Sequence, residues 1–251
     1  MAVWAAAPGA APAAGTPAEE GDASMLRMSH MTKVYYVGDE AVHALDDLSL
    51  HVRPHEFVAI CGPSGSGKTT LMNMMGCLDV PDFGSYYLDG VDVLSCNDRE
   101  LSLIRSRKIG FVFQQFNLLS QMTALENVEL PLIYQKCSAK ERTERAKEAL
   151  CKVGLEKRML HRPTELSGGQ QQRVAIARAL ANSAQVILAD EPTGNLDSRS
   201  GNDVMQLIER LSSEGHTIVL ITHSPDIAKR AQRTVYVKDG KLYDRLEEVA
   251  I

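Results

Sequence analysis

The chain has 251 residues, of which 44% are hydrophobic and 24% charged, a balance typical of a globular protein with a buried core. Its 27 Lys plus Arg stand against 32 Asp plus Glu, and this net charge of -5 argues against a nucleic-acid partner. Five cysteines, odd in number and without a C-x-x-C pair, argue against a disulfide framework or a zinc site.

No apolar run approaches the roughly 20 residues that a membrane-spanning helix requires. The first seven residues are apolar, but no basic residue precedes them and the run breaks at Pro8 and Gly9, unlike a signal peptide. We therefore expect a cytoplasmic protein without a membrane span of its own.

The N-terminal segment 1–24 contains ten Ala, three Pro and three Gly, so 16 of its 24 positions are residue types that build no amphipathic face. We expect a disordered tail there, followed by one folded domain over residues 25–251.

The first third of that domain predicts mixed α and β structure, beginning near Met31. Strands are expected around a turn at Gly38, and an apolar strand precedes a glycine-rich loop and a helix. A further hairpin is expected around Asp89 and Gly90. The expected strands are 32–37, 42–52, 57–61 and 85–88, and the expected helix is 69–78.

The rest of the chain predicts a helical insertion at about 115–183, then strands alternating with helix. Continuous apolar runs of strand length favour a parallel sheet covered on both faces, and the chain closes with a hairpin. The expected helices are 139–153, 171–181 and 201–213, and the expected strands are 186–189, 217–222, 234–237 and 242–243.

The glycine-rich loop matches the pattern G-x-x-x-x-G-K-[ST], which wraps main-chain N–H groups around phosphate. Lys68 is expected to reach the β and γ phosphates, and Thr69 to offer a hydroxyl to Mg²⁺. The alternative is an ordinary glycine turn, but the strand before and the helix after favour a phosphate loop. Its residues are Gly62, Pro63, Ser64, Gly65, Ser66, Gly67, Lys68 and Thr69.

Two carboxylates, Asp190 and Glu191, end the apolar run that starts at Val186. Ligands of open α/β sheets lie at the carboxyl ends of strands, so Asp190 is expected to hold Mg²⁺ and Glu191 to deprotonate the attacking water. Alone, the pair would read equally well as solvated acids at a strand exit.

The segment Leu166-Ser-Gly-Gly-Gln170 precedes a helix and offers a second set of free N–H groups. In isolation the leading interpretation is a helix cap with Ser167 as the N-cap. Its combination with the phosphate loop and the two carboxylates favours a second nucleotide contact.

Taken in order, these motifs, with Gln114, Asn195-Leu-Asp197 and Ile221-Thr-His223, resemble the ATPase subunits of ABC transporters over about residues 31–245. Gly76-Cys-Leu-Asp79 and Gly194-Asn-Leu-Asp197 are similar to the MacB, LolD and FtsE branch. The resemblance implies an α/β P-loop NTPase fold, RecA-like and mostly parallel, with an antiparallel β subdomain and a helical subdomain.

The resemblance also implies roles for single residues. Tyr35 would stack on adenine, with Tyr36 as the alternative, and Thr70 would contact the nucleotide. Gln114 would reach Mg²⁺ and the attacking water, and His223 would contact the γ phosphate.

A head-to-tail homodimer is implied as well, held together by ATP. In it Ser167, Gly168, Gly169 and Gln170 of one chain would close on the γ phosphate bound by the other, and Asp197 would cross the interface.

A separate transmembrane permease is the implied partner, docked near residues 114–122 and the helices after them, which would place the chain at the inner face of the cell membrane. We expect an ATPase that powers export or extraction of a hydrophobic or amphiphilic substrate, such as a lipoprotein, macrolide or peptide. The alternative is an FtsE-like ATPase that drives a membrane partner in cell division or cell-wall regulation without transport. Soluble ABC ATPases of DNA repair and translation fit poorly, because only 98 residues separate Lys68 from Ser167 and no sustained heptads lie between them.

Overall fold

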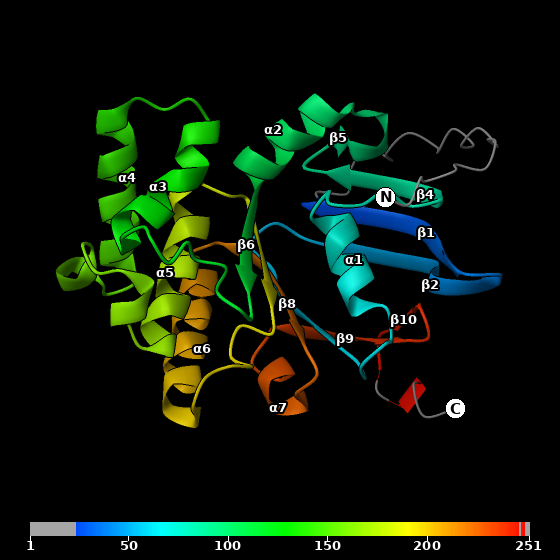
Figure 1. The fold of residues 1–251 in the computed structure, drawn as a ribbon. Helices are drawn as coiled ribbons and strands as arrows, with labels where there is room; N and C mark the ends of the chain where they lie inside the picture. Colours follow the sequence, from blue (N-terminus) through cyan, green and yellow to red (C-terminus); the bar gives the residue numbers. More distant parts are fainter. Residues whose placement is uncertain (1–23, 246, 249–251) are drawn as a thin grey trace.

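Two β-sheets and a group of helices make up the part of the chain that the computed structural model describes, residues 24–245 and 247–248. The predicted tail 1–24 lies outside the described residues except for Ser24. Helices α3 to α6 gather on one side of the central sheet, and the second sheet lies on the other side (Figure 1).

The central sheet has six strands in the order β10-β9-β3-β8-β7-β6. Neighbours from β9 to β6 run parallel, and β10 alone is antiparallel, to β9. Every residue of β3 and β8 is buried, as expected for continuous apolar strands covered on both faces. The strands are β3 (Phe57–Cys61), β6 (Ile109–Phe113), β7 (Val186–Asp190), β8 (Thr217–Thr222), β9 (Arg233–Lys238) and β10 (Lys241–Tyr243).

Side chains of the central sheet alternate between two hydrophobic cores. In β3, Phe57 and Ala59 belong to the core shared with the group of helices, whereas Val58 and Ile60 belong to the core shared with the second sheet. The period of two that defines a strand therefore ties both halves of the molecule to one rigid sheet.

The second sheet is antiparallel, in the order β2-β1-β4-β5. Its first strand begins at Leu26, earlier than the predicted start near Met31, because register shifts and a left-handed His30 (φ 53) interrupt the alternation that marks a strand. The strands are β1 (Leu26–Val37), β2 (Glu40–Val52), β4 (Phe83–Leu88) and β5 (Val91–Asp92).

Helix α1 (Lys68–Met75) packs between the two sheets, with Leu71, Met72, Met74 and Met75 buried. The helix ends at Met75, with Gly76 as its C-cap, rather than at the predicted Leu78, because Cys77 adopts a left-handed backbone (φ 53) that closes the last turn.

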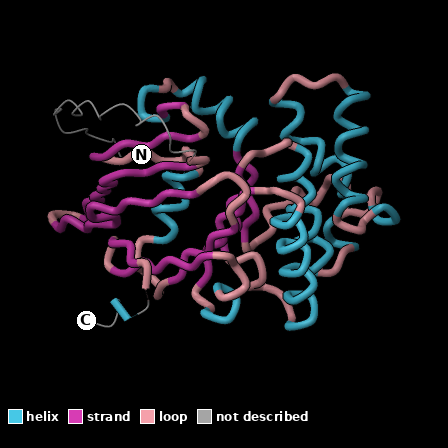
Figure 2. Tube along the Cα trace, turned by 180° about the vertical axis from the view of Figure 1, so that it is seen from behind, coloured by secondary structure: helices cyan, strands magenta, loops and turns pink. Residues whose placement is uncertain are grey.

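Most helices occupy the chain between β6 and β8. Seen from behind, they stand on one side of the molecule and the strands on the other (Figure 2). Helix α2 was not expected from the sequence, and α3 was expected only as part of the helical insertion at about 115–183. The helices beyond α1 are α2 (Asp98–Lys108), α3 (Ala124–Tyr134), α4 (Ala139–Lys152), α5 (Gly168–Ala181), α6 (Ser198–Ser213) and α7 (Pro225–Ala228), with short 3₁₀ turns at Val93–Ser95, Glu156–Arg158 and Pro163–Glu165.

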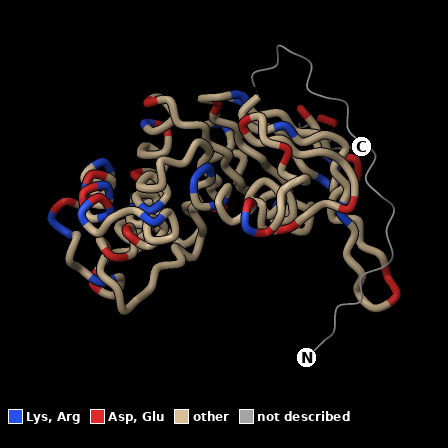
Figure 3. Tube along the Cα trace, turned by 90° about the horizontal axis from the view of Figure 1, so that it is seen from above, with Lys and Arg blue, Asp and Glu red and all other residues tan. Residues whose placement is uncertain are grey.

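Charged residues of both signs are interspersed over these helices, without a broad stripe of one sign (Figure 3). Among the described residues, no helix combines the length and the hydropathy that crossing a bilayer would require.

Candidate functional site

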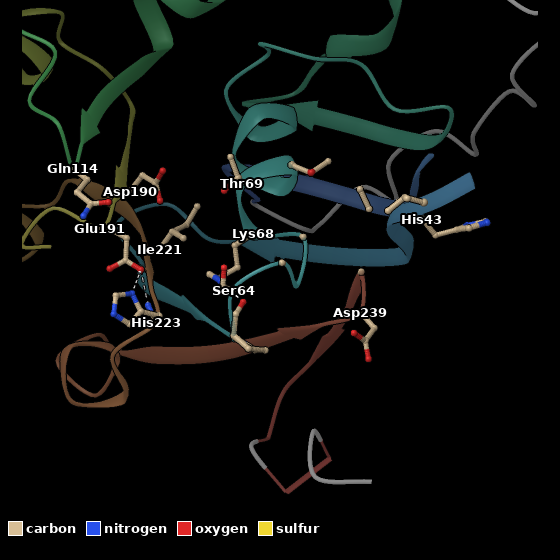
Figure 4. A pocket seen from close by; sticks show the side chains of 17 residues that line it. His43, Ser64, Lys68, Thr69, Gln114, Asp190, Glu191, Ile221, His223 and Asp239 are labelled. Carbon is tan, nitrogen blue, oxygen red and sulfur yellow. Dashed lines mark hydrogen bonds and ion pairs between the residues drawn. The ribbon is translucent and has the colours of Figure 1, made fainter. Parts of the chain in front are cut away.

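A cavity of about 1160 Å³ opens where the carboxyl ends of the central strands meet the start of α1 (Figure 4). The register explains the meeting, since Phe113, Asp190 and Ile221 are successive Cα partners across β6, β7 and β8. The residues that follow these strand ends, Gln114 and Glu191 among them, are therefore brought to one edge.

The phosphate-loop motif forms one wall of this cavity between β3 and α1. Gly67 has φ 107, and a Cβ there would lie 2.4 Å from the Ala44 carbonyl oxygen. A Cβ on Gly62 would lie 2.2 Å from the Val237 carbonyl oxygen, so both positions require glycine. Of the predicted loop residues, Pro63, Ser64, Gly65, Gly67, Lys68 and Thr69 line the cavity, as does the predicted contact Thr70, whereas Gly62 and Ser66 are not among the lining residues.

The Lys68 ammonium folds back over the loop. It donates to the Pro63 carbonyl over 2.6 Å and lies 3.5 Å from the Ser66 hydroxyl. Burial lowers the pKa of Lys68, while the charges of Glu191 and Asp190 oppose that shift. The Lys68 ammonium therefore lies in the cavity at the N-terminal end of α1, an arrangement that favours an anionic ligand.

Asp190 faces the same cavity from the end of β7. Burial raises the pKa of Asp190, and the neighbouring Glu191 charge raises it further, against the opposing effect of Lys68. A carboxylate held in this way would be stabilised by an additional cation.

Magnesium fits these side chains by the chemistry of their atoms. Thr69, Asp190 and Gln114 bring a hydroxyl, a carboxylate and an amide to one cavity, all of them hard oxygen donors. Within the described residues no cluster of three or more His, Cys, Asp or Glu could hold a metal alone. Mg²⁺ uses few protein ligands and takes the remainder from phosphate and water.

Glu191 follows Asp190 in a left-handed backbone (φ 44) and is tied to the end of β8. The His223 main-chain N–H donates to Glu191 Oε1 over 2.7 Å, and His223 Nδ1 lies 2.6 Å from the same oxygen. The Thr222 hydroxyl donates to Oε2 over 3.3 Å. Figure 4 shows the Glu191 and His223 side chains pointing toward each other below Asp190.

Tyr35 does not line the cavity in this structure. Its hydroxyl donates to Asp79 over 2.6 Å, and burial, with that hydrogen bond, raises the pKa of Tyr35 to about 12. Its cross-strand partner Val42 does line the cavity, and directly opposed residues share one face of a sheet. The register thus favours Tyr35 over Tyr36 for the face nearer the cavity.

Part of the wall was missed by sequence reasoning. It comes from β2 and from the turn between β9 and β10, which carry no local nucleotide-binding signal. These residues are Val42, His43, Ala44, Asp239 and Gly240.

The segment Leu166–Gln170, called the signature segment below, lies apart from this cavity, at the start of α5. The Ser167 hydroxyl caps the helix by accepting from the Gln170 N–H, and Gln170 Oε1 accepts from the Ser167 N–H over 3.0 Å. Asp197 caps α6 by accepting from the N–H groups of Arg199 and Ser200. Neither Asp197 nor any residue of Ser167–Gln170 is among the residues that line the cavity.

Comparison with known proteins agrees with this geometry. A sequence profile of the ABC transporter family matches residues 45–194. YvrO of Bacillus subtilis, an ABC transporter ATP-binding protein, is 55% identical over 218 residues, which are 87% of this chain and 95% of YvrO. The macrolide export ATP-binding/permease protein MacB of Brucella melitensis is 51% identical over 88% of this chain but only 34% of its own length.

A solved structure extends the comparison to three dimensions. The cassette MJ0796 of Methanocaldococcus jannaschii, a dimer in a post-hydrolysis state bound to ADP and Pi, superposes with a TM-score of 0.80. The two chains are 49% identical over 88% of this chain and 97% of that one. The chain therefore belongs to the ABC transporter family, as one of its ATP-binding cassettes that hydrolyse ATP.

Proposed function

We propose that two copies of this chain bind ATP with Mg²⁺ and hydrolyse it to drive a separate membrane permease. The observation that carries the proposal is the single cavity in which the phosphate loop, Asp190, Glu191 and Gln114 meet. A phosphate cradle, a cation site and a candidate base within one cavity are the parts that phosphoryl transfer to water requires.

Each side chain has a separate task in this proposal. Lys68 binds the β and γ phosphates, and Thr69, Asp190 and Gln114 hold Mg²⁺, which when bound neutralises phosphate charge. Glu191 takes the proton of the attacking water, because the His223 N–H fixes one carboxylate oxygen and leaves the other with only a 3.3 Å contact from Thr222. His223 adds a contact to the γ phosphate.

The second copy supplies the residues that this cavity lacks. Ser167 caps the start of α5, and the positive end of that helix would suit a phosphate bound by another chain. The dimeric form of MJ0796 supports this arrangement. In it Ser167–Gln170 face the partner's γ phosphate, and Asp197 crosses the interface.

A second hollow, of about 380 Å³, suits a helix of the permease. It is mostly apolar and lies between α2, β6, α3 and α5, beside the strand that leads into Gln114. Of the predicted docking segment 114–122 only Asn117 lines it, and most of the lining comes from the surrounding elements. Its apolar wall includes Phe111, Phe113, Leu130, Pro131 and Tyr134, the last 73% exposed.

The hollow also lies against α5, the helix that begins with the signature segment. Arg178 of α5 donates to the main-chain oxygens of Phe116 and Asn117, in the loop just after Gln114. A permease helix in the hollow would thus contact a loop that touches both Gln114 and α5, at the inner face of the membrane. Similarity to MacB supports export of a hydrophobic or amphiphilic substrate.

The test begins with phosphate release by the purified chain, followed by co-purification of its membrane partner from detergent-solubilised membranes. Leu130→Arg, in the hollow, should keep ATP hydrolysis and lose the partner. The control Leu160→Arg changes a residue that is 77% exposed and outside the hollow, and should lose neither. Retention of the partner by Leu130→Arg would refute the docking site, and a division-site partner instead of a permease would favour the FtsE-like alternative.

A further inference from the structure

Gln114 is held by a residue from a distant part of the chain. Its side-chain Nε2 donates to Asn195 Oδ1 over 3.1 Å, and Asn195 Nδ2 donates to the Gln114 main-chain oxygen over 3.1 Å. Gln114 follows β6, and Asn195 lies in the loop between β7 and α6, 81 residues later. Two amide groups are thus joined reciprocally at the rim of the cavity.

The direction of these bonds follows from one fixed atom. A main-chain carbonyl can only accept, so the Asn195 group facing the Gln114 carbonyl must be its NH₂. Asn195 Oδ1 is then the atom left for the Gln114 side chain, and an oxygen can only accept from its NH₂. The Gln114 amide is therefore left with Oε1 free.

The neighbouring glycine fixes the position of the same side chain. A Cβ on Gly194 would lie 2.6 Å from Gln114 Nε2 and 3.0 Å from its Cδ. The Gln114 amide therefore packs directly against the main chain of the loop that carries Asn195. In Figure 4 the Gln114 side chain points toward Asp190.

We propose that Asn195 is a positioning residue that turns Gln114 Oε1 toward the cavity and its NH₂ away from it. The inference rests on the proposed function, in which ATP binds there with Mg²⁺. An amide oxygen suits a hard cation or the hydrogen of a water, whereas an NH₂ group facing the cation would repel it. Asn195 thus determines which of the two similarly shaped ends of the Gln114 amide, the oxygen or the NH₂, faces the cavity.

Without Asn195, the Gln114 amide turns between two orientations, and only one of them binds the cation. The loss should be no more than about tenfold in affinity, since a single neutral hydrogen bond changes an equilibrium by about that factor. The loss should also be confined to binding that involves the metal.

The test measures the dissociation constant of ATP twice for each variant, once with Mg²⁺ and once with EDTA. For Asn195→Ala and the similarly sized Asn195→Leu, we expect affinity with Mg²⁺ to fall about three- to tenfold and affinity in EDTA to stay at the wild-type value. Gln206→Ala, an exposed amide on α6 outside the cavity, serves as the control and should change neither constant.

A double-mutant cycle separates positioning from general damage. In a Gln114→Ala background, Asn195→Ala should cost nothing further with Mg²⁺, because there is no amide left to orient. Equal losses in both buffers, or an undiminished loss in the Gln114→Ala background, would overturn the inference while leaving the proposed function intact. A wild-type chain that binds no ATP in either buffer would overturn both.

Discussion

The Glu191 carboxylate is held by His223 through two contacts on one oxygen, a main-chain N–H at 2.7 Å and Nδ1 at 2.6 Å. The Glu191 side chain is 16% exposed, whereas that of His223 is 70% exposed. The carboxylate is therefore fixed by the end of β8, and the imidazole remains open to a ligand in the cavity.

Glu191→Gln should keep ATP binding and lower hydrolysis by about 10²–10⁴-fold, because the amide oxygen can still accept from the His223 N–H but the side chain takes no proton from water. Phosphate release and ATP binding, measured on one preparation, check this. Size-exclusion chromatography with ATP should also show a dimer. Glu148→Gln, a largely exposed acid on α4, is the control, and near-normal turnover by Glu191→Gln would disprove the role.

Lys68→Ala should weaken ATP binding by about 10- to 100-fold, the size expected for losing hydrogen bonds from a charged donor to phosphate. Equilibrium titration with ATP measures the effect. Lys229→Ala removes a largely exposed lysine that pairs with Asp226, and should bind ATP as the wild type does. Unchanged affinity in Lys68→Ala would contradict the phosphate-loop interpretation.

Tyr35→Ala should weaken ATP binding by roughly 1–3 kcal/mol, the range for a base stacked on an aromatic ring. Tyr36→Ala is the matched control, because Tyr36 follows Tyr35 on β1 and its side chain therefore points to the opposite face of the sheet. Binding constants for ATP decide between them. A larger effect from Tyr36→Ala would transfer the adenine contact to that residue.

Asp190→Asn should raise the melting temperature of the nucleotide-free protein at neutral pH. A carboxyl whose pKa is raised by folding binds its proton more tightly in the folded chain, so its contribution to stability falls as the pH rises through the folded-state pKa. The asparagine avoids that loss, and its advantage should shrink as the pH is lowered through that pKa. The same variant should lose the Mg²⁺-dependent part of ATP binding.

Asp89→Asn provides a control of opposite sign. The Lys108 hydrogen bond lowers the pKa of Asp89, so this carboxylate stabilises the fold above its ordinary pKa and loses that effect as the pH falls through the folded-state value. Melting curves should show Asp89→Asn below the wild type at neutral pH and level with it in acid. Equal shifts for both variants would contradict the electrostatic account of Asp190.

The sequence predicts those parts of the fold that short patterns encode. The run that forms β3 is apolar at every position and that of β8 is apolar from Ile218 to Ile221, and both strands form as expected. Helix α3 was predicted only as part of the helical insertion, without bounds, because Pro131 interrupts its sequence pattern. Helix α2 was missed because only Leu101 and Ile104 face the core. The capping boxes at Thr123 and Asn97 are the signals that could have revealed them.

The same division applies to the site. The phosphate loop is eight consecutive residues and can be read directly, whereas the bond between Gln114 and Asn195 joins positions far apart in the chain. Likewise, the wall from Val42 to Ala44 faces the cavity only because the two sheets pack around α1. Contacts of this kind depend on tertiary packing, which no local pattern carries.

The separation of the signature segment from the cavity has a kinetic consequence. If Ser167–Gln170 must come from a second chain, then ATP binding to one chain and completion of the site by dimer formation are separate events. The first is first order in protein concentration and the second is second order. ATP affinity should persist on dilution, while turnover per chain falls. Specific activity would then be a property of the pair, and a membrane partner that holds two copies together would restore first-order behaviour.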